Sequence, residues 1–133
     1  MAKGRIITLT GSRRFLPQFK RAHVELTLLG VSTLTMAMAS TGETEGWSAG
    51  AKEMADLVYL QHILRSDGVL VLGDGYIGFS GAREITWANM LGVPCQRWYM
   101  DLGISVAVDK LDRGSNDEVL ANTARRRFLQ GPQ

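Results

Sequence analysis

The sequence predicts a three-layer α/β/α fold, in which a parallel sheet of about five strands lies between two layers of helices. Short apolar and β-branched runs alternate along the chain with segments of helical periodicity, and this alternation is typical of parallel α/β proteins. The run from Gly68 to Leu72 is apolar throughout, as in a strand that is buried on both faces of a parallel sheet.

The composition indicates a soluble globular protein. The 133 residues, of which 45% are hydrophobic and 21% charged, are expected to form one domain over residues 1–133. A net charge of +2 is too small to argue for nucleic acid, so we expect no such partner. The single cysteine, Cys95, excludes an internal disulfide framework and fits a reducing compartment. With no signal-peptide pattern and no run near the roughly 20 apolar residues that span a bilayer, we expect a cytoplasmic protein without a membrane partner.

The first third of the chain predicts a strand, a helix and a second strand. Arg5 to Thr10 is β-branched and ends at Gly11-Ser12, which predicts the first strand. An amphipathic helix is expected from Leu16 to Leu29, with Gly30 as its stop. Val31 to Met38 is the second candidate strand.

The next segment predicts a loop, a long helix and a central strand. Residues 39–46 are polar and rich in glycine, as expected of a loop. Ser48 is a candidate cap for a helix that runs to about Arg65, and the third strand follows at residues 69–72. The expected core face of this helix consists of Met54, Leu57, Val58, Ile63 and Leu64.

The remainder predicts two more helices and two strands. A glycine-rich turn leads into a helix from Ala82 to Leu91, which Gly92-Val-Pro94 ends. A strand is expected near Cys95 to Tyr99 and a last one at Ile104 to Val108. A final helix is expected from Asn116 to Leu129, with Ser115 as its cap.

The first candidate site is Glu84, which we expect in the first turn of its helix, beside the glycine-rich strand end. Open α/β sheets bind ligands at this edge, where Gly78, Ser80 and Gly81 can present hydroxyl and N–H groups to an anion or a sugar. A carboxylate held there can attack an anomeric carbon and form a covalent glycosyl-enzyme. The alternative is structural: Glu84 complements the helix dipole or pairs with Arg83 or Arg97 at the surface.

The second candidate site is the turn Gly11-Ser12-Arg13-Arg14 after the first strand. Since the ends of parallel strands share one edge, this turn should face the same crevice as Glu84. Two arginines, a hydroxyl and free N–H groups can hold a phosphate or carboxylate, although a capped turn with solvated arginines is the alternative. The turn lacks the Lys-Ser/Thr ending of a P-loop, and Gly73-x-Gly-x-x-Gly78 matches a dinucleotide fingerprint only weakly. We expect no cofactor.

Five further residues have less specific interpretations. Asp67 precedes the third strand, so its position alone predicts a turn residue at the edge away from the crevice, whereas Asp74 follows the strand at the ligand-binding edge. Trp47 could cover a base, although a hydrophobic staple is an equal alternative. His23 and His62 have no partner spacing for a metal, and no metal site is expected.

The ordered set of motifs resembles the nucleoside 2-deoxyribosyltransferase-like superfamily, which includes nucleoside 5′-monophosphate N-glycosidases. The resemblance covers about residues 5 to 98, and it implies a flavodoxin-like or Rossmann-like sheet. Its motifs are Ile6-Ile-Thr-Leu-Thr-Gly-Ser12, Ile63-Leu-Arg-Ser-Asp-Gly-Val-Leu-Val-Leu72, Tyr76-Ile-Gly-Phe-Ser-Gly-Ala-Arg-Glu-Ile-Thr-Trp-Ala88 and Leu91-Gly-Val-Pro94.

The resemblance implies roles for several of these residues. Glu84 matches the family's catalytic glutamate, Asp67 matches an aspartate near base and sugar, and Gly11-Ser12-Arg13 is similar to a phosphate loop to which Ser80 adds a contact. The implied activity is hydrolysis or transfer of the N-glycosidic bond of a (deoxy)nucleoside or its 5′-monophosphate, by a homodimer or higher homo-oligomer.

Two other functions stay open. One is a nucleotide-binding or sequestering protein of the same fold without catalysis. The other is a phosphoribohydrolase resembling cytokinin-activating enzymes, which ranks lower because the chain lacks their Pro-Gly-Gly-x-Gly-Thr run.

Overall fold

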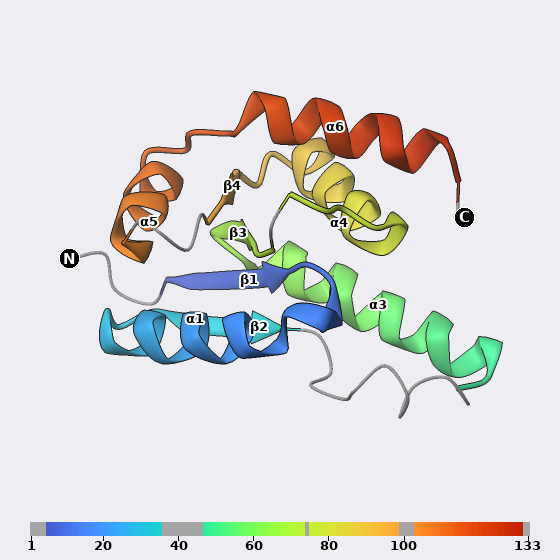
Figure 1. Cartoon of the computed structure of the whole chain (residues 1–133), viewed down its shortest axis with the longest axis horizontal. Coiled ribbons are helices and arrows are strands. Elements are labelled where there is room, and N and C mark those ends of the chain that lie inside the picture. Colours follow the sequence, from blue (N-terminus) through green and yellow to red (C-terminus); the bar gives the residue numbers. More distant parts are fainter. Residues whose placement is uncertain (1–4, 36–46, 74, 99–102, 132–133) are drawn as a thin grey trace.

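A sheet of four parallel strands forms the centre of the protein (Figure 1). The computed structural model describes residues 5–35, 47–73, 75–98 and 103–131. The strands are β1 (Ile6–Thr10), β2 (Ser32–Thr35), β3 (Gly68–Val71) and β4 (Cys95–Arg97), and their order in the sheet is β2-β1-β3-β4. All three pairings between neighbouring strands are parallel, which confirms the predicted fold class.

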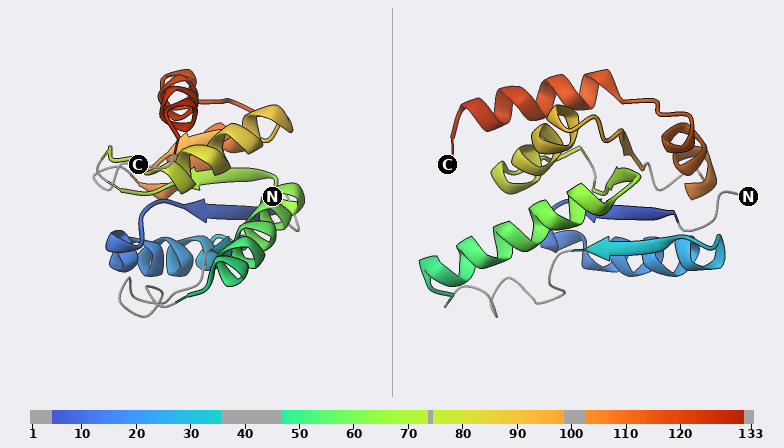
Figure 2. Two further views of the ribbon diagram at one scale, coloured as in Figure 1. Left: turned by 90° about the vertical axis from the view of Figure 1, so that its right-hand side faces the viewer. Right: turned by 180° about the vertical axis from the view of Figure 1, so that it is seen from behind.

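Helices cover both faces of the sheet, because alternate residues of its strands point to opposite sides. Ile7, Leu9 and Leu70 pack on α1 (Leu16–Leu28) and α5 (Ile104–Asp112). Val69 and Val71 face the layer formed by α3 (Ala49–Arg65) and α4 (Phe79–Met90), and α6 (Glu118–Leu129) packs along α4. The left view of Figure 2 shows α1 and α3 on opposite sides of the sheet.

Two predicted helix ends are confirmed by their local contacts. Ser48 caps α3, where its side-chain oxygen accepts a hydrogen bond from the Ala51 N–H at 3.1 Å. Gly30 follows the last residues of α1 with φ +78°, a left-handed conformation that glycine adopts without steric cost.

The prediction of a fifth strand at Ile104 to Val108 is wrong, because this segment forms the first half of α5. Its buried residues, Ile104, Ala107, Val108 and Leu111, recur at intervals of three and four, which is the period of a helix. The β-branched residues suggested a strand, but packing of this apolar face against the sheet favours the helix. The sheet therefore has four strands within the described residues rather than about five.

Smaller differences occur at other element ends. The cap of α6 is Asp117, whose carboxylate accepts from the Leu120 N–H at 3.0 Å, and not the predicted Ser115. The second strand is described from Ser32 to Thr35; residues 36–38 of its predicted range, the predicted loop 39–46 and Tyr99 lie outside the described residues. Within the described ranges, no helix is both long and apolar enough to cross a membrane.

The predicted core face of α3 is largely wrong. Only Ile63 is buried, whereas Met54, Leu57, Val58 and Leu64 are exposed. The reason is that α3 is apolar on two faces, and only one of them meets the sheet.

Candidate active site at the carboxyl ends of β1 and β3

Glu84 is a buried carboxyl group on α4. Its exposed fraction is 9%, and it lies in the second turn of a helix that begins at Phe79. The prediction of a first-turn position is therefore wrong. Because the helix dipole acts mainly on the first turn, the dipole interpretation of Glu84 also fails.

Glu84 is held at the end of the central strand β1. The hydroxyl of Thr10, the last residue of that strand, donates a hydrogen bond of 2.6 Å to Oε1 of Glu84. Burial raises the pKa of Glu84 from 4.5 to about 7, while the Thr10 hydrogen bond and the charge of Arg83 oppose part of the rise. Near neutral pH the carboxyl group is thus poised between its neutral and ionised forms.

Arg83 does not form the surface pair considered from the sequence. Its guanidinium donates to Oδ1 of Asp56 on α3 at 2.6 Å and lies 5.0 Å from the centre of the Trp87 ring. This pair ties α3 to α4 directly beside Glu84. The interpretation of Glu84 as a surface ion-pair partner is wrong, because its carboxyl group is buried.

The loops after β1 and β3 touch each other, as expected for neighbouring parallel strands. A Cβ on Gly11, which has φ +145°, would lie 2.7 Å from the carbonyl oxygen of Leu72. Gly73, after β3, donates its N–H to Oε1 of Gln18 at 3.1 Å, and a Cβ there would lie 2.9 Å from the Phe15 ring. Glycine is required at both places, and the predicted juxtaposition of the two turns is confirmed.

Arg14 and the N-terminus of α4 belong to the same two loops. The guanidinium of Arg14 stacks over the Tyr76 ring at 4.0 Å from its centre, and Ser12 Oγ accepts a long 3.4 Å contact from the Arg14 backbone N–H. Arg13 lies in a short 3-10 helix, η1 (Arg13–Phe15), that follows Ser12. The N-cap of α4 is Gly78, which offers no side chain to bond the first N–H groups of the helix. The following residues of this turn, Ser80 and Gly81, are exposed and half-buried respectively.

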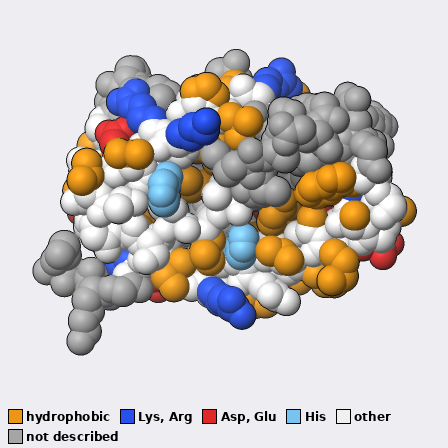
Figure 3. Space-filling model, turned by 90° about the horizontal axis from the view of Figure 1, so that it is seen from below, with side chains coloured by type: hydrophobic (Ala, Val, Ile, Leu, Met, Phe, Trp, Pro, Cys, Tyr) orange, Lys and Arg blue, Asp and Glu red, His pale blue; other side chains and the backbone are white. Residues whose placement is uncertain are grey.

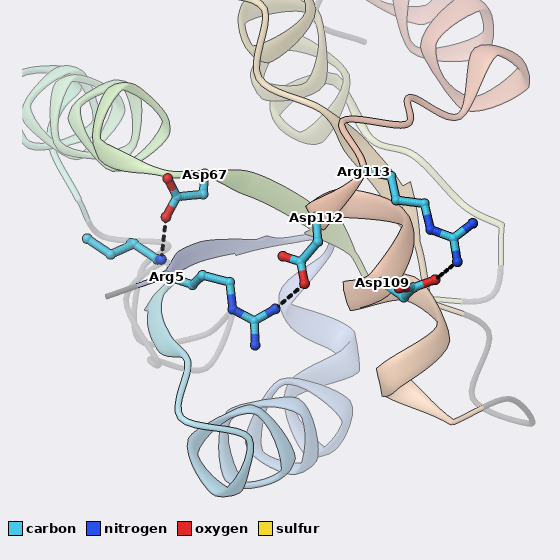
Figure 4. Close-up of polar contacts among 6 residues, drawn as sticks. Arg5, Asp67, Asp109, Asp112 and Arg113 are labelled. Carbon is cyan, nitrogen blue, oxygen red and sulfur yellow. Dashed lines mark hydrogen bonds and ion pairs between the residues drawn. The ribbon is translucent and has the colours of Figure 1, made fainter. Parts of the chain in front are cut away.

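Asp67 lies at the other end of β1 (Figure 4). Its Oδ2 accepts a hydrogen bond from the Ile6 N–H at 2.8 Å, and Ile6 begins the strand that Thr10 ends. The four residue steps from Ile6 to Thr10 along β1 correspond to about 13 Å. The location predicted from the position of Asp67 in the sequence is correct, and within one chain Asp67 does not meet Glu84.

A hollow lies at this far edge of the sheet. It has a volume of about 310 Å³, and its lining includes Asp67, Gly68 and the ion pair between Arg5 and Asp112 (Figure 4). Its position beside the amino ends of β1 and β3 separates it from Glu84.

The remaining predicted site residues are placed as follows. Asp74 lies outside the described residues, and Trp47 is half-buried directly before the Ser48 cap, so its contact with a base stays a prediction.

Burial raises the pKa of the Cys95 thiol to about 12, which makes it unreactive. Among the described residues, no group of three or more His, Cys, Asp and Glu side chains could hold a metal ion.

Solved structures with a similar fold include two enzymes. One is a 2-deoxyribosyltransferase from the psychrotolerant bacterium Bacillus psychrosaccharolyticus, with a TM-score of 0.57 and 23% identity over 69% of this chain and 70% of the other. The other is the CMP N-glycosidase BcmB of Clostridium botulinum, with a TM-score of 0.52 and 13% identity over 84% of both chains. The chain has their fold. The resemblance predicted from the sequence is thereby confirmed at the level of the fold.

No protein-family model and no curated protein sequence matches the chain.

Neither Thr10 nor the pair between Asp56 and Arg83 was predicted from the sequence. A signal for Thr10 is present: a hydroxyl residue ends the buried strand β1, immediately before a candidate ligand loop. Asp56 has no such signal, because its partner lies on a different helix.

Proposed function

We propose that this protein cleaves or transfers the N-glycosidic bond of a (deoxy)nucleoside or its 5′-monophosphate, with Glu84 as the nucleophile. The observation that carries the proposal is the buried Glu84 carboxyl group, held by Thr10 where the loops after β1 and β3 meet. The two enzymes that share the fold, a 2-deoxyribosyltransferase and a CMP N-glycosidase, support the same class of substrate.

The reaction proceeds in two displacements at one carbon atom. The ionised carboxylate of Glu84 attacks C1′ of the sugar, the C1′–N bond breaks with its electron pair going to the base, and the base takes up a proton from water. A glycosyl ester then joins Glu84 to the sugar. Attack on C1′ by water completes hydrolysis, attack by a second base completes transfer, and either step regenerates the carboxylate.

Thr10 is a positioning residue in this scheme. Its hydrogen bond fixes one oxygen of Glu84 and leaves the other oxygen for attack. Because the bond favours the ionised form, it also keeps a useful fraction of Glu84 ionised near pH 7 in spite of burial.

The 5′-phosphate is assigned to the loop after β1 and the amino end of α4. Arg14 supplies a positive charge, and the N–H groups after Gly78 are free of a side-chain cap. Such groups bind phosphate well, and the positive end of a helix adds to the attraction. Asp67 receives no role within one chain, because it lies at the opposite end of β1.

The experiment compares wild type with Glu84→Gln on a panel of nucleosides and 5′-monophosphates, with and without a second base as acceptor. Glutamine keeps the shape and can still accept the Thr10 hydrogen bond. We expect release of free base, measured by chromatography, to fall about a thousandfold or more, while nucleotide binding changes only slightly. Acid-quenched wild type should carry the mass of the sugar fragment on Glu84.

Glu118→Gln, a change of the same type at an exposed position of α6, is the matched control and should leave base release unchanged. Full activity of Glu84→Gln would show that the nucleophile is wrongly assigned. Tight nucleotide binding without base release in the wild type would instead identify a non-catalytic nucleotide-binding protein of this fold.

A further inference from the structure

The ion pair between Asp56 and Arg83 lies beside Glu84, where α3 meets α4. The Arg83 guanidinium donates to Asp56 Oδ1 at 2.6 Å, and the two side chains are 17% (Arg83) and 35% (Asp56) exposed. Glu84 follows Arg83 directly on α4. Both charges act on the Glu84 carboxyl group, since Arg83 lowers its pKa and Asp56 raises it. The pair therefore belongs to the immediate surroundings of the proposed nucleophile.

Aromatic rings hold Arg83 in addition to Asp56. Its guanidinium lies 5.6 Å from the centre of the Phe79 ring and 5.0 Å from that of the Trp87 ring, one helical turn before and after it. Its Nε is buried and has no hydrogen-bond partner in the described part of the chain. Among the described residues, Glu84 is the only buried acid. Since a guanidinium has several donors and no acceptor, Arg83 would pair with Glu84 if Asp56 did not hold it.

Asp56 is turned toward α4 on a helix whose solvent-facing side is largely apolar. Met54, Leu57 and Leu64 are exposed on α3, and Figure 3 shows hydrophobic side chains gathered over this part of the molecule. A carboxylate on the inner side of such a helix loses hydration, and a partly buried ion pair contributes little net stability. The inward position of Asp56 is therefore better explained by its effect on a neighbouring group than by a contribution to folding.

We propose that Asp56 is a positioning residue, which holds the Arg83 guanidinium away from the Glu84 carboxylate and so leaves this carboxylate free to attack the sugar. An arginine bonded to the nucleophile would neutralise the charge that makes it reactive. It would also occupy the carboxylate oxygen that must reach C1′, because Thr10 already bonds the other one. The inference rests on the proposed function, since it gives Asp56 a part in the same reaction.

The described groups that act on the ionisation of Glu84 come from three elements. Thr10 at the end of β1 and Arg83 on α4 favour the carboxylate, whereas Asp56 on α3 opposes it. As long as Asp56 and Arg83 are paired, their effects on Glu84 partly cancel. Removal of Asp56 leaves a positive charge beside Glu84, and removal of Arg83 leaves a negative one. The two substitutions should therefore move the pKa of Glu84 in opposite directions.

The experiment compares Asp56→Ala, Arg83→Met and the double variant in the pH profile of base release. Methionine keeps apolar contact with the flanking rings without the charge. Asp56→Ala should move the midpoint about one pH unit lower and reduce the high-pH plateau of kcat/KM about tenfold, because Arg83 then pairs with Glu84. Arg83→Met should move the midpoint to higher pH. The double variant should return both the midpoint and the plateau close to those of wild type.

Restoration in the double variant separates this role from a structural one. If the pair only tied α3 to α4, both single variants and the double variant would lose activity evenly at all pH values. Asp56→Asn is a milder variant, whose amide oxygen can still accept from Arg83, so its plateau should fall much less than that of Asp56→Ala. The matched control is Asp109→Ala, which breaks an exposed ion pair with Arg113 and should change neither quantity.

A carbon NMR titration of the Glu84 carboxyl group tests the inference without turnover. We expect its midpoint to fall in Asp56→Ala and to return in the double variant. If the wild type releases no base but these midpoints move as expected, the proposed function fails while Asp56 still keeps Arg83 from Glu84. A Glu84 titration that is unchanged in Asp56→Ala, or an activity loss that Arg83→Met does not restore, would overturn the inference.

Discussion

Thr10→Val should shift the pH dependence of catalysis to higher pH. The substitution preserves the shape of a side chain that is only 2% exposed, and it removes the hydroxyl that donates to Glu84 Oε1 at 2.6 Å. Without this donor, the ionised form of Glu84 loses more stabilising free energy than the neutral form does. Its pKa, already about 7, should therefore rise further.

The size of the shift follows from the two kinds of hydrogen bond. A bond to a charged group contributes about 1.5–3 kcal/mol and a neutral one about 1 kcal/mol, so the ionised form loses roughly 1.4 kcal/mol more, which is about one pKa unit. At pH 7 the ionised fraction then falls from about one half to about one tenth. We expect kcat/KM at pH 7 to decrease about fivefold and to recover at higher pH, where both proteins are ionised.

The assay is the pH profile of base release, combined with a carbon NMR titration of the Glu84 carboxyl group. Thr8→Val is the matched control, because Thr8 is equally buried on the same side of β1 and bonds to Ser66 instead of Glu84. It should leave the midpoint of the profile unchanged. A Thr10→Val profile that keeps the wild-type midpoint, with activity lowered evenly at all pH values, would refute the role assigned to the hydroxyl group.

Three further predictions follow from the same geometry. In urea unfolding, Glu84→Gln should stabilise the protein at pH 8 but not at pH 4. The pKa of Glu84 is about 7 in the folded protein against 4.5 in the unfolded chain, so the wild type loses about 3 kcal/mol of unfolding free energy as the pH rises from 4.5 to 7. The neutral glutamine does not incur this loss. In steady-state assays, Arg14→Gln should weaken the apparent affinity for nucleoside monophosphates about tenfold or more and leave the affinity for nucleosides unchanged. The control Arg126→Gln, at an exposed position of α6, should change neither affinity. Gly11→Ala should cost about 3 kcal/mol or more of unfolding free energy, against about 1 kcal/mol for Gly114→Ala, where φ is also positive but the space is open.

The parallel sheet was predictable because its strands and helices differ in period and in apolar content. The run at Gly68–Val71 is fully buried, and the caps at Ser48 and Gly30 mark their helix ends through local chemistry. The segment at Ile104 was not predicted correctly, because all five residues from Ile104 to Val108 are small or β-branched. Only the longer spacing to Leu111 reveals its helical face.

The candidate site was predictable where it depends on strand direction. Gly11 and Gly73 follow parallel neighbours, so their loops had to meet, and Asp67 had to lie at the far end of β3. Burial and partners were not predictable in this way. Glu84 is a buried acid one turn inside α4 because of how that helix packs beside the end of β1, and no local pattern encodes that distance.

The exposed face of α3 shows the limit of periodicity in the other direction. Met54, Leu57, Val58 and Leu64 have the spacing of a core face, yet one chain provides a core only for the opposite side of the helix. A hydrophobic period indicates that a surface is to be covered, and it does not indicate whether the same chain or another one covers it. The sequence prediction of burial failed at these residues because spacing along a helix is a local property, whereas burial depends on which side of α3 meets the sheet.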